Sequence, residues 1–210
     1  LSTSAATPVA LLAILALAAV PVAGSVGQPA LQQQDGAATG NYSILQDGEC
    51  TTITPLGDGT QSVEEFYDYR TPNTSPESYS YSSLGTVDLQ QDDTSILFLY
   101  EGTEGTSLVL VHDRVYGDTN GSAVTMQFDG LPEDGEWVVE DDSYSDSING
   151  GPDDEFEHGE TSSRITWVFS ENSTDGGAFR GGLGDDDFEL TVDPAFNDDA
   201  DFREYPGEIT

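Results

Sequence analysis

The stretch SILFLY, residues 95–100, decides the fold class of this chain. It is a continuous apolar run of only six residues, rich in β-branched and aromatic side chains, which predicts a strand buried on both faces. The stretch TSLVLVHDR follows at residues 106–114, and Gly102-Thr103-Glu104-Gly105 stands between the two. Two such runs joined by a short glycine-containing turn predict an antiparallel hairpin.

Further strand patterns flank this hairpin on both sides. The turn sequence Asn120-Gly121 precedes an alternating run at 123–128. The other expected strands lie at 50–54, 63–69, 137–139, 165–169 and 188–192. These seven or eight short strands, with no helical period between them, predict an all-β fold, an antiparallel β-sandwich of immunoglobulin-like or jelly-roll type. A small β-barrel is the alternative.

Three further expectations follow from this pattern. Trp137 and Trp167 are expected in the core, with ligand stacking as the alternative role. Cys50 is the single cysteine, so it cannot close an internal disulfide, and we expect it as a small buried apolar residue. Residues 141–160, rich in Ser, Asp and Gly, are expected to form a long exposed loop.

The N-terminal region has the layout of an export signal. Residues 8–23, PVALLAILALAAVPVA, carry no charge and are followed by the small residues Gly24 and Ser25. This predicts a signal helix in residues 1–25, with cleavage after Ser25 or, as the alternative, after Gly24. A transmembrane anchor is the alternative, but it needs about 20 apolar residues, and Pro21 interrupts this shorter run. Residues 26–41 then read as a flexible Gln/Gly/Ala-rich linker, and residues 42–210 as one acidic β-sandwich domain.

The charge of the chain points to a saline environment. It has 40 Asp+Glu, five arginines and no lysine, for a formal net charge of −35. The acids are spread from Asp35 to Glu208 rather than gathered in one patch. At molar ionic strength the Debye length is about 3 Å, so such carboxylates keep the surface hydrated without strong repulsion. The composition therefore predicts a protein of an extreme halophile, and it excludes nucleic acid and anionic membranes as partners of the folded domain.

Two kinds of modification or ligand site can be read from short motifs. Four N-glycosylation sequons begin at Asn41, Asn73, Asn120 and Asn172, all in segments expected to be loops. Asp185, Asp186 and Asp187 follow Gly184 in a glycine-rich loop, where carboxylate oxygens could bind Ca²⁺. The EF-hand spacing is missing, so a solvated acidic turn is the alternative.

Catalytic motifs do not emerge from the sequence. Neither His112 nor His158 belongs to a zinc-protease motif, and a nucleophile-elbow motif and a phosphate-binding loop are both missing. A pair of carboxylates for glycoside hydrolysis stays open, because 40 acidic residues give many combinations.

The signal segment, Gln-rich linker and lysine-free acidic β-domain together resemble secreted or cell-surface proteins of haloarchaea. Many proteins of that group carry a C-terminal PGF-type sorting tail, which this chain does not show. We expect a secreted or cell-surface protein without enzymatic activity, acting in adhesion, envelope structure or ligand binding. Its expected partner is an envelope protein or a carbohydrate. The alternatives are a secreted hydrolase with a carboxylate pair and a Ca²⁺-dependent binding module.

Overall fold

The computed structural model of the protein describes residues 42–69, 82–117, 121–141, 154–169, 173–184 and 188–196. The expected signal helix and linker lie outside these residues. The described part contains ten strands and one short helix: β1 Tyr42–Gln46, β2 Glu49–Ile53, α1 Val63–Tyr67, β3 Ser95–Gly102, β4 Gly105–His112, β5 Ser122–Asp129, β6 Glu136–Glu140, β7 Glu155–His158, β8 Ser162–Phe169, β9 Asp175–Arg180 and β10 Thr191–Phe196.

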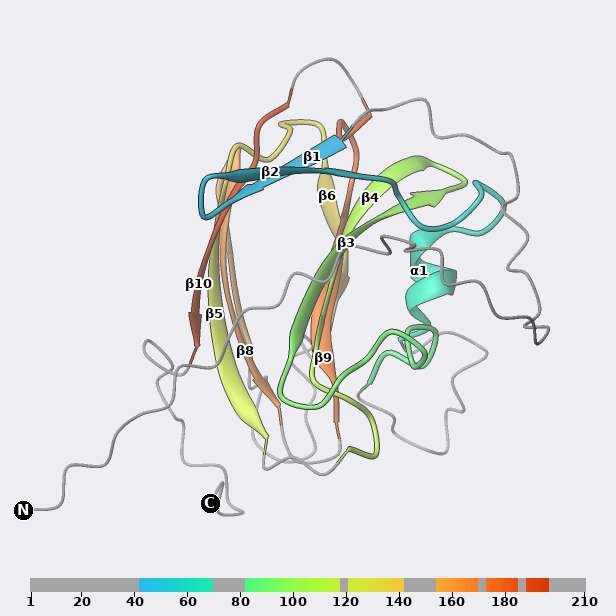
Figure 1. Ribbon diagram of the computed structural model, residues 1–210, viewed down its shortest axis with the longest axis vertical. Helices are drawn as coiled ribbons and strands as arrows, with labels where there is room; N and C mark the ends of the chain where they lie inside the picture. Colours follow the sequence, from blue (N-terminus) through green and yellow to red (C-terminus); the bar gives the residue numbers. More distant parts are fainter. Residues whose placement is uncertain are drawn as a thin grey trace, which may run out of the picture.

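Eight of these strands form two antiparallel sheets that face each other (Figure 1). The strand orders are β10-β5-β8-β7 and β3-β4-β9-β6. The hairpin expected from residues 95–114 is confirmed, because β3 and β4 pair continuously from Ser95 opposite His112 to Gly102 opposite Gly105. The all-β sandwich is therefore confirmed, and two sheets of four strands match the strand number of a jelly roll.

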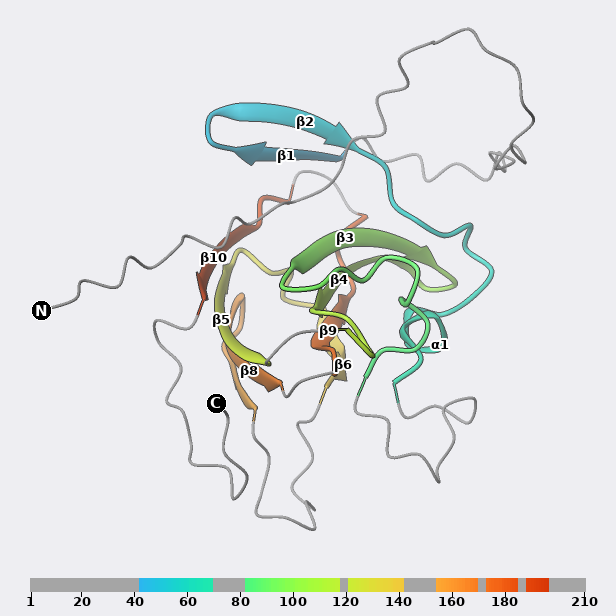
Figure 2. The same cartoon turned by 60° about the horizontal axis from the view of Figure 1, so that its bottom comes forward.

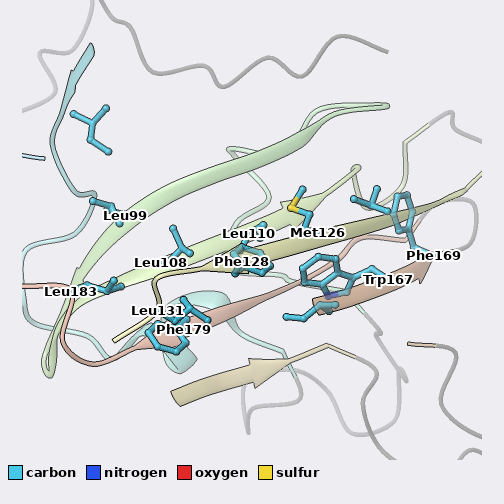
Figure 3. Packing of buried hydrophobic residues seen from close by; sticks show 13 residues of the cluster. Leu99, Leu108, Leu110, Met126, Phe128, Leu131, Trp167, Phe169, Phe179 and Leu183 are labelled. Carbon is cyan, nitrogen blue, oxygen red and sulfur yellow. The ribbon is translucent and has the colours of Figure 1, made fainter. Parts of the chain in front are cut away.

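The main core lies between the two sheets (Figure 3). Side chains at alternate positions of β4, β5 and β8 fill it, because one face of each strand points at the opposite sheet. Trp167 on β8 is fully buried, and its indole N–H donates to the carbonyl oxygen of Gly176 on β9 across the sandwich, at 2.9 Å. The expected core role of Trp167 is confirmed.

The outer face of the β3-β4-β9-β6 sheet is covered by a third layer (Figure 1). Here α1 packs Val63 and Tyr67 onto the sheet, and Phe66 stacks on Tyr100 with ring centroids 4.1 Å apart. The prediction of a strand at 63–69 was wrong. Ser62 caps the helix by accepting a hydrogen bond from the Glu65 N–H at 3.2 Å, and Val63 and Tyr67 lie one helical turn apart on one buried face.

The β1–β2 hairpin lies beside the sandwich, near the outer strands β3 and β10 (Figure 2). One of its faces packs on the core through Tyr42, Ile44 and Ile53, and the other face is exposed. Cys50 and its cross-strand neighbour Leu45 lie on the exposed face. The expectation that Cys50 is buried was therefore wrong, because strand alternation in a hairpin buried on one face turns every second residue to solvent.

Three other parts of the chain differ from what the sequence predicts. Strand β9, which carries Gly176 and Gly177, was not predicted. A Cβ at Gly176 would lie 2.2 Å from the Leu110 carbonyl oxygen, so the close approach of β4 requires glycine there. The prediction of a long exposed loop at 141–160 was wrong at both described ends, because Asp141 is buried and β7 lies within this range. Strand β10 begins at Thr191, later than the pattern at 188–192 predicted.

Candidate functional site

The modification and metal sites expected from sequence lie outside the described residues. This holds for Asn41, Asn73, Asn120 and Asn172, and for Asp185, Asp186 and Asp187. Parts of three sequons are described: Tyr42 and Ser43 belong to β1, Ser122 begins β5, and Thr174 is buried with its hydroxyl accepting from the Ser83 N–H at 2.9 Å. Because the four acceptor asparagines themselves lie outside the described residues, their expected place in loops stays a prediction.

Two features of the described part bear on metal binding and on membrane insertion. Among these residues, no three His, Cys, Asp or Glu side chains come together in a way that could hold a metal ion. No helix in the same residues has the length and apolar character needed to cross a membrane.

His112 is a fully buried histidine at the end of β4. Its ring lies between the sheets, with its centroid 4.6 Å from that of Trp167, and its Nδ1 is 2.7 Å from the Ser95 hydroxyl. Nε2 is buried without a hydrogen-bond partner. Burial lowers the pKa of His112 to about 3, so this imidazole is neutral in the folded protein at any pH near neutrality. A neutral, enclosed ring of this kind serves packing rather than proton transfer with a substrate.

His158 takes part in a chain of hydrogen bonds at one edge of the sandwich. The Trp137 indole N–H donates to the Ser163 hydroxyl at 2.9 Å, which lies 2.9 Å from His158 Nδ1. His158 Nε2 lies 2.8 Å from a Glu140 carboxylate oxygen. With the proton on Nε2, Ser163 donates to His158, and His158 donates to Glu140. This is the hydrogen-bond order of a hydrolytic Ser-His-acid triad.

The position of Ser163 argues against that chemistry. It is 3% exposed, points into the sandwich and already accepts the Trp137 N–H. A substrate carbonyl would have to reach its hydroxyl from solvent, and the packing prevents this. Since Trp137 and Glu140 belong to β6, and His158 and Ser163 to β7 and β8, the chain instead joins the two sheets at this edge. Trp137 is only partly buried, so it borders the core that it was expected to fill.

One pair of carboxylates that the structure brings close together is also inaccessible. Asp141 at the end of β6 and Asp175 at the start of β9 are both buried near Tyr67, whose hydroxyl donates to Asp141 at 3.2 Å. Burial raises the pKa of Tyr67 well above its usual value, and the charges of Asp141 and Asp175 raise it further. These two acids therefore belong to the packing between α1 and the sheet, and a glycan could not reach them.

A turn formed by residues 114–117 follows β4 and carries an exposed aromatic side chain. The Gly117 N–H donates to the Arg114 carbonyl oxygen at 3.1 Å and closes the turn. Its third residue, Tyr116, has φ +59° and is 84% exposed. Arg114 is also exposed, whereas Val115 between them is buried. The turn thus presents an arginine and a tyrosine to solvent while its middle is fixed to the fold.

Comparison with known proteins gives this chain no relatives: no family model, no curated protein and no solved structure matches it.

Proposed function

We propose that this chain is an exported surface protein of an extreme halophile that works by binding a partner, in adhesion or envelope structure, and not by catalysis. The observation that carries this proposal is the turn at residues 114–117. It combines Tyr and Arg, two of the residue types that most often anchor protein interfaces, and it exposes both side chains to solvent.

The backbone of Tyr116 supports the same reading. A positive φ at a bulky residue costs about 1–3 kcal/mol, and glycine or asparagine normally fills this position of a turn. The hydrogen bond from the Val115 N–H to the Gln90 side-chain oxygen, at 3.0 Å, helps to hold the turn in this conformation, so the folding of the domain offsets that cost. The ring itself is left exposed, and a partner that buried it would gain the free energy of burying a tyrosine side chain.

The chemistry-bearing residues inside the fold support binding in preference to hydrolysis. His112, Asp141 and Asp175 are buried in packing, and Ser163 is enclosed at the sandwich edge. Export is supported by the uncharged segment at residues 8–23, and the saline environment by the net charge of −35.

N-terminal sequencing of the protein from culture medium and from the cell envelope tests export. The mature chain is expected to begin near Val26 in those fractions, with little protein in the cytoplasm. Recovery of all the protein from the cytoplasm, with Leu1 still in place, would reject the proposed location.

A further inference from the structure

We infer that Arg114 and Tyr116 form a docking tip whose partner is the carboxylate-rich surface of a second copy of this chain. This inference rests on the proposed binding function and adds the identity of the partner.

The first argument is the state of Arg114 within this charge distribution. The chain has 40 acidic residues and five arginines, so an arginine that folds onto its own surface readily finds carboxylates. Arg180 does so with three glutamates, Glu64, Glu104 and Glu136. Arg114 is exposed and forms no ion pair with any residue in the described part of the chain. Its planar guanidinium is thus available for two parallel hydrogen bonds to a carboxylate from outside.

The second argument is that the tip is built rigidly. The N–H of Val115 donates to the Gln90 side-chain oxygen at 3.0 Å, and the N–H of Asp113 donates to the Thr94 carbonyl oxygen at 3.0 Å. Gly117 packs so closely that a Cβ there would lie 2.5 Å from Asp92 Oδ1. A tip held in place from both ends loses little conformational freedom on binding, which favours affinity.

The third argument concerns the shape and chemistry of the partner. An exposed turn contacts the surface of another protein more readily than it encloses a small ligand, because small-ligand sites are concave. The complementary surface must be acidic, and the surface of this same chain meets that requirement with 40 acidic residues. In molar salt the long-range repulsion between two copies is screened within about 3 Å, whereas hydrogen bonds and ring burial at contact persist.

This contact is between unlike surfaces, a tip on one copy and an acidic face on the next. Contacts of this kind build rings or open arrays instead of closed two-fold dimers. The inferred product is therefore an assembly that grows by adding copies, which suits a role in an envelope layer.

Sedimentation velocity of the purified full chain in molar KCl, from micromolar to millimolar protein, tests the inference. Wild type is expected to increase in mean mass with concentration. Arg114→Glu and Tyr116→Ser should each weaken this association about tenfold or more, since a tenfold change corresponds to about 1.4 kcal/mol and interface anchors of this type carry about 2 kcal/mol or more. Leu45→Ser is the matched control: it removes another exposed apolar side chain, 75% exposed on the β1–β2 hairpin, and should leave association unchanged.

Thermal unfolding of each variant tests whether it is folded. Tyr116→Gly is a second variant of the tip, and it relieves the strain of the positive φ because glycine adopts that conformation freely. It should melt at or above the wild-type temperature and still associate weakly. A wild type that stays monomeric at millimolar concentration would overturn the inference, as would association that persists in all tip variants. Binding of the monomer to polyglutamate through Arg114 would assign the tip to a foreign acidic partner and also overturn it. The sedimentation and unfolding measurements use purified protein, so their outcome is independent of whether the protein is exported.

Discussion

His112 shows how a single buried residue sets the pH range of this fold. Its ring is enclosed by Trp167 and by Phe169, and it has one hydrogen bond, to Ser95. Burial lowers its pKa to about 3, against about 6.5 in an unfolded chain. The unfolded state therefore takes up a proton between these two values and the folded state does not. The stability that His112 contributes is complete above pH 6.5 and is lost as pH falls toward 3.

We predict that His112→Phe removes this part of the acid sensitivity. Between pH 6.5 and pH 5 the wild type should lose about 1.6 kcal/mol more unfolding free energy than the variant, because the loss rises toward about 1.4 kcal/mol per pH unit as pH falls below the unfolded pKa. Denaturant titrations in molar KCl at several pH values measure both slopes. Parallel slopes would show that the imidazole is not the titrating group.

For single residues, the sequence predicts burial well where an apolar strand pattern decides it. It predicts burial poorly where the packing of neighbouring elements decides it. Trp167 was placed in the core from its run of apolar neighbours. Cys50 was misplaced, because the sequence does not show that the hairpin is covered on one face only. The positive φ of Tyr116 could not be predicted from the sequence, because it arises from the anchoring of its neighbours and not from the conformational preference of tyrosine.

At the scale of elements, Arg180 links three parts of the fold. It lies at the end of β9 and contacts Glu64 of α1, Glu104 of the β3–β4 turn and Glu136 of β6. Its side chain is 19% exposed, so these contacts are partly shielded from water. Without the guanidinium, three glutamates would converge with no cation between them.

We predict that Arg180→Gln lowers the unfolding free energy by about 1 kcal/mol, because it breaks charge-assisted hydrogen bonds whose partners are partly exposed to solvent. Arg114→Gln is the control, since it removes the same charge from an exposed site and should change stability by less than about 0.5 kcal/mol. Chemical unfolding in molar KCl measures both. Equal effects would mean that net charge, and not the three contacts, accounts for the loss.

The connection between β9 and β10 carries the Ca²⁺ hypothesis. We predict that an Asp185→Asn, Asp187→Asn variant binds Ca²⁺ more weakly than wild type, because Ca²⁺ requires several carboxylate oxygens. Calorimetric titration with Ca²⁺ in constant KCl measures the difference. Equally weak binding by both proteins would show a diffuse acidic surface in place of a site.

The sequence predicted the central elements and missed those defined by tertiary contact. The β3–β4 hairpin has a continuous apolar pattern and a short turn, so it could be found locally. Strand β9 has two glycines where strands usually have β-branched residues, and only the closeness of β4 and β6 explains them. Helix α1 is five residues long, too short for a periodic pattern to distinguish it from a strand.

At the scale of the whole molecule, the dominant fact is a charge of −35 on 210 residues. At 0.01 M salt the Debye length is about 30 Å, so carboxylates across the domain repel one another, and unfolding separates them. We predict that the melting temperature falls steadily as KCl is lowered from molar to millimolar at neutral pH. A melting temperature that stays constant over this range would mean that the acidic surface is not an adaptation to salt.

Acidification at low salt separates the two charge effects in this protein. Protonating carboxylates relieves repulsion as pH approaches the sequence pI of about 4.1, and this relief should raise the melting temperature in millimolar KCl. His112 acts in the opposite direction over the higher range below pH 6.5, where few carboxylates have yet taken up a proton. In low salt, acidification should therefore raise the melting temperature of wild type less than that of His112→Phe.

In molar KCl the repulsion between carboxylates is already screened, so acidification should lower the melting temperature of wild type and change that of the variant little. Thermal unfolding of both proteins at two salt concentrations and two pH values completes the comparison. If both proteins gained equally from acid in low salt, surface charge alone would account for the pH response, and His112 would have no measurable part in it.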